Sequence, residues 1–122
     1  MNTLQAEAYC LSLPGATEDM PFGDDVVTFR VANKIFAFMF LGHQPQRLAL
    51  KCDPERAIQL RAKYDAIEAA YHLNKKHWNQ LEIANLPSKL IEDLIVHSYN
   101  LVLDKLPKII RNEILSNKDQ DA

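Results

Sequence analysis

The sequence lacks any long hydrophobic segment. No stretch of about 18 consecutive apolar residues occurs, as a membrane-crossing helix would need. The segment from Met1 to Cys10 has no basic region followed by an apolar run, so it does not resemble a secretion signal. The only cysteines, Cys10 and Cys52, are far apart in the sequence. We therefore expect a cytoplasmic protein, neither exported nor membrane-spanning, with reduced thiols rather than a disulfide.

The sequence has only three glycines and no glycine-rich loop. A phosphate-binding loop, a dinucleotide fingerprint and a nucleophile elbow are all absent. Cys10 has no evident base. Cys52, just before a helix start, could gain a lowered pKa from nearby amides, but we favour a small buried thiol at a strand end. We expect neither enzymatic activity nor a cofactor.

The histidines lack metal-ligand spacing, because they form no HxxxH pattern and the cysteines form no CxxC pattern. They are His43, His72, His77 and His97. We expect no metal site, and we interpret His97, beside an apolar helix stripe, as a hydrogen-bonded core residue. Four acids surround residues 21–23, namely Glu18, Asp19, Asp24 and Asp25. This cluster is more typical of an acidic loop with a packed Phe22 than of a cation site.

Neither sign of charge is in large excess. The 14 basic and 16 acidic residues give a net charge of -2 and a pI near 6.0. Nucleic-acid-binding domains are usually basic as a whole, so any such binding must come from a local patch. A chain of 122 residues with 48% hydrophobic content fits one domain with one core.

Hydrophobic periodicity predicts an α+β domain that begins with a helix and three strands. Asn2 and Gln5 can form a capping box for a first helix that ends near Pro14. A short link around Asn33 suits a hairpin, because asparagine tolerates positive φ. The three strands are predicted at residues 26–31, 35–41 and 47–51.

The second half of the chain predicts a helix, two strands and a final helix. Asp53 followed by Pro54 is a strong helix start. Leu86-Pro87 opens the last helix, which Pro107 interrupts. We expect a two-layer domain over residues 1–111, with a five-stranded antiparallel sheet covered by helices on one face, and a polar, flexible tail at residues 112–122.

The strand at residues 35–41 is apolar on both sides. Alternation that buries Ile35, Ala37 and Met39 on one face leaves aromatic side chains for the other, namely Phe36, Phe38 and Phe40. This pattern predicts that both faces of the sheet are covered at this strand. The second cover could be a partner protein or a second copy of the chain.

Residues 71–79, which we call the finger, form the most distinctive segment. No acid lies between Glu68 and Glu82. If Tyr71 and Leu73 lie on one strand and Trp78 opens the next, a hairpin turn at residues 74–77 points into solvent. The finger consists of Tyr71, His72, Leu73, Asn74, Lys75, Lys76, His77, Trp78 and Asn79.

The finger can be interpreted in two ways. As a binding element, its lysines pair with phosphates, its histidines donate hydrogen bonds, and Trp78 or Tyr71 stacks on a base. Alternatively it is a solvated turn, with lysines that protect a sheet edge and Trp78 as a lid on the core, which we favour for Trp78. The combination of lysines, histidines and asparagines favours a binding role for the whole segment.

Other cations could extend this patch. They are Arg30, Lys34, Lys51, Lys105, Lys108 and Arg111. The last three share one helical side, but a stabilising position at a helix C-terminus explains Lys105 better. The candidate nucleic-acid-binding residues are Tyr71, His72, Asn74, Lys75, Lys76, His77, Trp78, Lys51, Arg30 and Lys34.

Several segments together resemble the MmcQ/YjbR family of small bacterial proteins. The matching residues are Cys10 to Gly15, Glu18, Pro21 to Gly23, Leu50 to Pro54, the finger, Leu86, Pro87, Ser98, Tyr99 and Leu106 to Lys108. The sequence departs from the family at Ala69 and Ala70, where Pro-Gly is usual, and at Leu73, where methionine is common. The resemblance implies a fold similar to CyaY and to secretion chaperones, and exposed hairpins that have been likened to DNA-binding wings.

Three functions follow as expectations. The first is a monomeric module that binds nucleic acid, duplex DNA above all, through the finger and nearby cations. The second is a protein-interaction or chaperone-like module that does not bind nucleic acid. The third and weakest is a small-ligand pocket around Tyr71, His72, His77 and Trp78.

Overall fold

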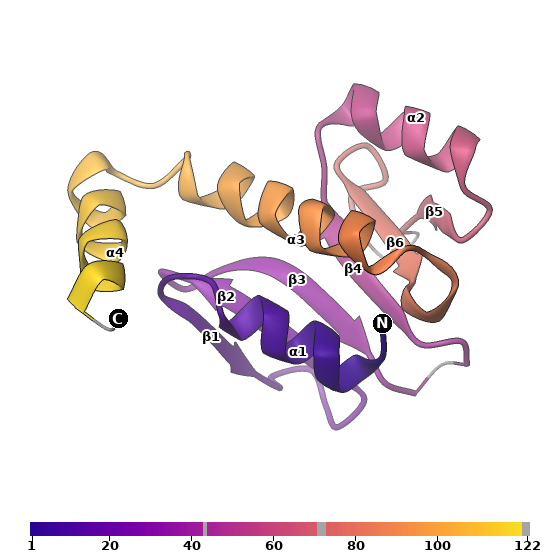
Figure 1. Cartoon of the computed structure of the whole chain (residues 1–122), viewed down its shortest axis with the longest axis horizontal. Helices are drawn as coiled ribbons and strands as arrows, with labels where there is room; N and C mark the ends of the chain where they lie inside the picture. The colour runs from indigo at the N-terminus through magenta and orange to yellow at the C-terminus, as the bar shows by residue number, and fades with distance from the viewer. Residues whose placement is uncertain (43, 71–72, 121–122) are drawn as a thin grey trace.

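The structure of the protein, a computed structural model, describes residues 1–42, 44–70 and 73–120. Within these residues one antiparallel sheet has the strand order β1-β2-β3-β4-β6-β5, and four α-helices accompany it (Figure 1). The strands are β1 (Ala16–Asp19), β2 (Val26–Val31), β3 (Lys34–Phe40), β4 (Arg47–Lys51), β5 (Ile67–Ala69) and β6 (Trp78–Glu82). The helices are α1 (Thr3–Leu11), α2 (Pro54–Lys63), α3 (Ser88–Leu103) and α4 (Lys108–Gln120), with a 3-10 turn η1 (Ile83–Asn85).

The predicted caps and the first turn form as expected. The Asn2 side chain accepts the Gln5 N–H at 2.8 Å, and the Gln5 side chain accepts the Asn2 N–H at 2.9 Å. Asp53 accepts the Arg56 N–H at 3.3 Å and so caps α2. Ala32 and Asn33 both have positive φ, 48° and 66°, as a tight two-residue hairpin turn requires.

The prediction of five strands was one short, because β1 is polar and mostly exposed. Its sequence, Ala-Thr-Glu-Asp, has no apolar alternation. Backbone pairing with β2 holds it in the sheet, with Ala16 opposite Val31 and Asp19 opposite Thr28. Gly15, with a φ of +73°, turns the chain from α1 into this edge strand.

A β-bulge corrects the expected side of Phe36. Phe29 pairs with Ala37, but Arg30 pairs with Ile35, so Phe36 has no partner and its side chain is 0% exposed. The Phe36 and Tyr99 rings make an edge-to-face contact with their centroids 5.4 Å apart. This contact lies on the side of the sheet that the helices cover. The simple alternation therefore failed at Phe36, although it holds for Phe38.

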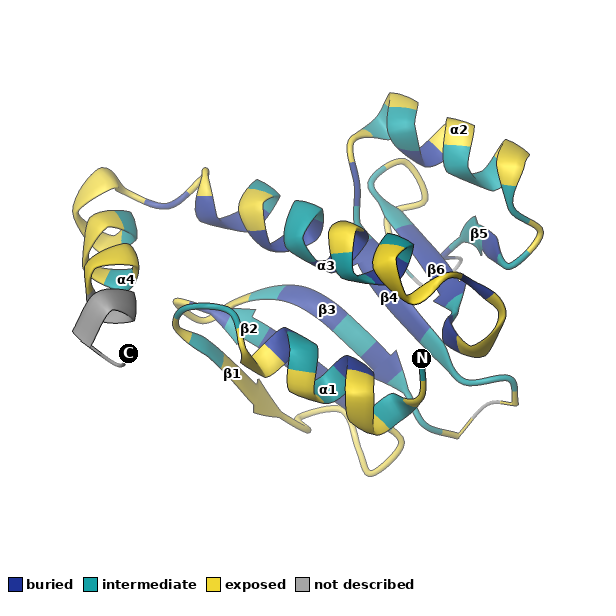
Figure 2. Cartoon of the chain, viewed as in Figure 1, coloured by how far each residue is buried: buried dark blue, intermediate teal, exposed yellow. Residues whose placement is uncertain are grey.

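Helices α1 and α3 lie over one face of the sheet, and the core lies between these two layers (Figure 2). Ser98 of α3 is fully buried at this junction. Its hydroxyl donates to the Phe36 carbonyl at 2.6 Å and accepts the Lys51 N–H at 2.9 Å. One side chain thus fixes α3 across β3 and β4.

The structure defines the ends of two predicted elements. β5 ends at Ala69, so Leu73 lies in a turn, where its N–H donates to the Ala70 carbonyl at 3.0 Å. After the predicted interruption at Pro107, helix α4 continues through Gln120, so the segment from Asn112 is helical. Ile114 of this helix packs against the core. No helix in the described residues is long and apolar enough to cross a membrane.

Candidate nucleic-acid interface

One end of the sheet gathers cations from distant parts of the chain. β3 begins at Lys34, β4 ends at Lys51, and β6 begins at Trp78. Because these strands are antiparallel neighbours, the three termini share one end. Lys51 is the register partner of Trp78, and the Cys52 N–H donates to the His77 carbonyl at 2.7 Å. We call this the basic end, defined by Lys34, Lys51, Lys75, Lys76, His77 and Lys105.

The described part of the finger is a compact turn. Asn74 organises it, because its side chain accepts the Lys76 N–H at 3.0 Å and its carbonyl accepts the Trp78 N–H at 2.9 Å. Lys75 and Lys76 are exposed at the tip, and His77 is half-buried. The predicted site residues Tyr71 and His72 lie outside the described residues.

Three lysines surround a cleft beside the finger. The cleft has a volume of about 390 Å³ and is lined by Lys34, Ile35, Lys51, Val102, Lys105 and Leu106. Burial, followed by the charge and proximity of Lys105, lowers the pKa of the Lys51 ammonium. Among the described residues, no carboxylate forms an ion pair with any of the three lysines.

Lys105 belongs to this cleft through tertiary structure. The residue follows the C-terminus of α3, as the sequence predicted, but it also faces Lys51. No local pattern could reveal this, because it depends on the path of α3 across β3 and β4.

Arg30 is committed to a structural role. Its Nε lies 3.1 Å from the Asp19 carboxylate, and one of its terminal nitrogens donates to the Asn33 carbonyl at 3.1 Å. The carboxylate also accepts a hydrogen bond from Thr28. The Thr28 bond, with that of Arg30, lowers the pKa of Asp19. Arg30 is therefore held by Asp19 and Asn33 and does not belong to the basic end.

Trp78 lies on the face of the sheet opposite the helices. The Trp78 and Phe38 rings make an edge-to-face contact with their centroids 5.4 Å apart. The Phe38 and Phe40 rings are stacked, with their centroids 6.3 Å apart. Phe22, 63% exposed, lies 6.3 Å from Phe38. Trp78 is half-buried and is not part of the core between sheet and helices, so its expected role as a core lid was wrong.

Acidic residues gather at the other end of the strands. Asp24 and Asp25 precede β2, Asp19 ends β1, and Glu82 ends β6. Arg47, which begins β4 there, lies 3.7 Å from Glu68. The chain is therefore polarised along its strands, although its net charge is only -2.

His97 and Cys52 lie near the basic end, close to α2. The His97 Nε2 accepts the Asp53 N–H at 3.1 Å, so the predicted hydrogen bond is present, but His97 is half-buried rather than part of the core. Burial, and then the charge of Arg56, lower the pKa of His97. Burial raises the pKa of Cys52, so the thiol is not activated. Arg56 was not singled out by the sequence analysis, because only the fold brings it close to His97.

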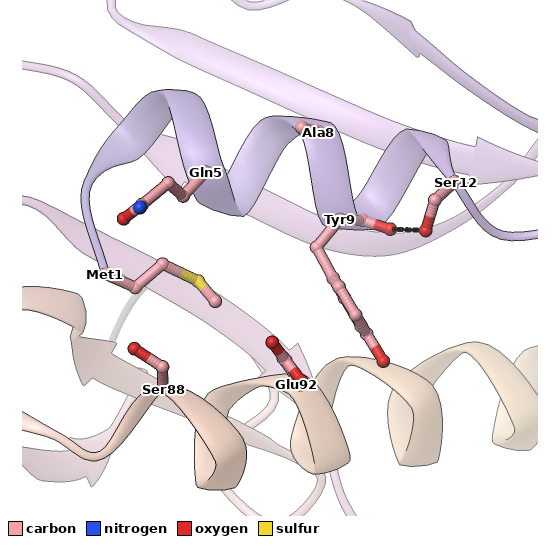
Figure 3. Close-up of a pocket in the computed structure, with 7 residues that line it drawn as sticks. All are labelled: Met1, Gln5, Ala8, Tyr9, Ser12, Ser88 and Glu92. Atoms are coloured by element: carbon pink, nitrogen blue, oxygen red, sulfur yellow. Dashed lines mark hydrogen bonds between the residues drawn. The ribbon is translucent and has the colours of Figure 1, made fainter.

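Other sites receive less support. Both cysteines are free and buried, and burial raises the pKa of Cys10 to about 12. The described residues contain no group of three or more potential metal ligands. A hollow of about 400 Å³ between α1 and α3 is lined by Met1, Gln5, Ala8, Tyr9, Ser12, Ser88 and Glu92 (Figure 3). This lining includes one carboxylate and no Lys, Arg or His side chain, so it does not extend the basic surface.

The fold and the basic end define a small α+β protein with one helix-covered antiparallel sheet and a polarised surface. The chain belongs to the YjbR family, whose family model matches residues 11–101. It is similar to the uncharacterized protein YbdF of Escherichia coli O157:H7, with 34% identity over 104 residues, which cover 84% of this chain and 85% of YbdF.

Solved structures are similar over most of the chain. The crystal structure of the Deinococcus radiodurans protein DR2400, a DUF419 domain, matches with a TM-score of 0.86 and 35% identity, covering 93% of this chain and 88% of that one. A crystal structure of a Pseudomonas syringae protein matches with a TM-score of 0.72 and 28% identity, covering 83% and 98%. The predicted family and fold class are therefore confirmed.

Proposed function

We propose that this chain binds duplex DNA through the basic end of its sheet. The observation that carries the proposal is the polarity of the molecule. Lys34, Lys51 and the finger converge at one end of the strands, and Asp19, Asp24, Asp25 and Glu82 lie at the other. Such a field attracts phosphates to one end and orients the approaching partner. This function places the protein in the cytoplasm.

The finger supplies the protruding contacts in this proposal. Lys75 and Lys76 are exposed at its tip and reach phosphate oxygens, while His77 adds a donor near the base. Trp78 is held by Phe38, so we assign it to supporting the finger rather than to stacking on a base. With so few contacts, the affinity should be modest and depend strongly on salt.

Fluorescence anisotropy of a labelled random duplex across a salt series tests this proposal. Each phosphate contact that is lost should reduce the log-log salt slope by about 0.9. Replacing Lys75→Gln and Lys76→Gln together should therefore reduce the slope by about 2 and weaken binding at low salt.

The control is Lys89→Gln, which removes one positive charge from the first turn of α3, where the finger variant removes two. Lys89 is exposed and lies 3.1 Å from Asp93, away from the basic end. The control should bind like the unmodified protein. The proposal is wrong if no binding occurs at low salt, or if the finger variant and the control behave alike.

A second candidate function is a protein-binding module that uses the helix-free face. Four aromatic rings lie there, and Phe38 is at their centre, in contact with Phe22, Phe40 and Trp78. An apolar cluster on the uncovered face of a sheet is typical of an interaction surface. The oligomeric state of the protein bears on this candidate.

A further inference from the structure

The lysine cleft has a different character from the exposed finger. It is concave, and its volume of about 390 Å³ is within the range of small-molecule sites. Ile35, Val102 and Leu106 provide an apolar wall, of which Val102 and Leu106 are buried. Lys34, Lys51 and Lys105 provide the polar groups. An apolar wall with a few converging charges is the usual composition of a ligand site.

The three amines are brought together by well-fixed elements. Lys34 begins β3 directly after the tight turn, and Lys51 ends the neighbouring strand β4. Ser98 binds both strands, and Lys105 follows it by about two helical turns along α3 and its C-terminal residues. The cleft is therefore preorganised by the backbone, and only the lysine side chains need to adjust to a ligand.

Among the described residues, no carboxylate forms an ion pair with Lys34, Lys51 or Lys105. Burial lowers the pKa of the Lys51 ammonium, and the nearby positive charge of Lys105 lowers it further. Lys51 is half-buried, whereas Lys34 and Lys105 are exposed. Holding these like charges close together costs free energy, which a bound anion would recover.

We propose that this cleft binds a phosphate monoester, with its dianionic group among Lys34, Lys51 and Lys105 and its organic part against Ile35, Val102 and Leu106. A monoester carries a charge of about -1.5 to -2 at neutral pH, which suits several ammonium groups better than the single charge of a backbone diester. The source is either a free phosphorylated small molecule or the terminal phosphate of a nucleic acid. The proposal goes beyond duplex binding by the finger and does not depend on it.

Titration of the full-length protein with phenyl phosphate, followed by two-dimensional NMR at constant ionic strength, tests the proposal. We expect saturable shifts centred on residues 34–35, 51–52 and 102–106. Inorganic phosphate should bind the same residues more weakly, because it cannot use the apolar wall.

Variants distinguish binding in the cleft from general attraction to positive surface charge. Lys105→Gln should weaken phenyl phosphate binding at least about fivefold, since it removes a charged donor, whereas Lys105→Arg should retain most of the affinity. Lys89→Gln is the control and should bind normally. Shifts that do not saturate, or that Lys105→Gln leaves unchanged, would overturn the proposal.

The two possible sources of the phosphate are distinguished with duplex DNA. If the ligand is a nucleic-acid end, a 5′-phosphorylated duplex should bind more tightly than an unphosphorylated one, and Lys105→Gln should remove the difference. If the ligand is a free molecule, phenyl phosphate binds but 5′-phosphorylation has no effect. Loss of duplex binding in the finger variant with phenyl phosphate binding intact would assign the two functions to separate residues.

Discussion

Ser98 shows how a single side chain organises the candidate site. Its hydroxyl joins the Phe36 carbonyl of β3 to the Lys51 N–H of β4, and its own side chain is 0% exposed. Both backbone groups lie where water cannot easily replace the hydroxyl. A buried group without a partner costs free energy, so Ser98 contributes more than an ordinary surface hydroxyl.

Replacing Ser98→Ala should lower the free energy of unfolding by about 2 kcal/mol, because it leaves a buried carbonyl and a part-buried N–H without partners. Urea denaturation measures this change. Ser12→Ala is the matched control, since the exposed Ser12 hydroxyl donates only to the Tyr9 carbonyl and its loss should cost less than about 0.5 kcal/mol. Equal losses in both variants would contradict the bridging role of Ser98.

At the scale of elements, α4 joins the rest of the fold through one apolar side chain. Ile114 of this polar helix packs against the core near the turn between α1 and β1. A Cβ added at Gly15 would lie 3.2 Å from the Ile114 Cγ2 atom. The position therefore needs glycine both for its positive φ and for the space that α4 occupies.

Replacing Gly15→Ala should destabilise the protein by about 1–2 kcal/mol, because alanine is strained at positive φ and crowds Ile114. The same substitution in an Ile114→Ala background should cost less, but not zero, since the strain persists. A double-mutant cycle from urea denaturation separates the two terms. If the cost is the same in both backgrounds, α4 does not pack on this turn in solution.

The whole molecule has two faces and two ends of different character. Helices cover one face, aromatic rings lie on the other, and charge is divided between the two ends of the strands. The rings contact one another, and Thr28 and Ala49 of the same face are already buried within the monomer. We infer that contacts within the monomer already cover much of this aromatic face.

Sedimentation velocity over a range of protein concentrations should therefore give one species with the mass of a 14.0 kDa monomer. If the mass increases with concentration, and Phe22→Ser with Phe38→Ser reverses the increase, the aromatic face is an interface and the protein-binding function gains support. Ile109→Ser is a suitable control, because Ile109 is 74% exposed on α4.

Features that depend on near neighbours could be predicted from local sequence. Asn2 with Gln5 and Asp53 with Pro54 start helices, and Asn33 turns a hairpin, because caps and tight turns involve only a few adjacent residues. The family resemblance and the α+β class follow from such local patterns taken together. The finger was also recognisable, because its cations are contiguous.

Contacts between residues that are distant in the sequence became visible only in the folded chain. The bulge that buries Phe36 depends on the pairing of two strands, and the edge strand β1 depends on hydrogen bonds with β2. The lysine cleft depends on the path of α3, which brings Lys105 to Lys51 across a long stretch of sequence. Such contacts are set by packing, and no periodicity or spacing in the sequence encodes them locally.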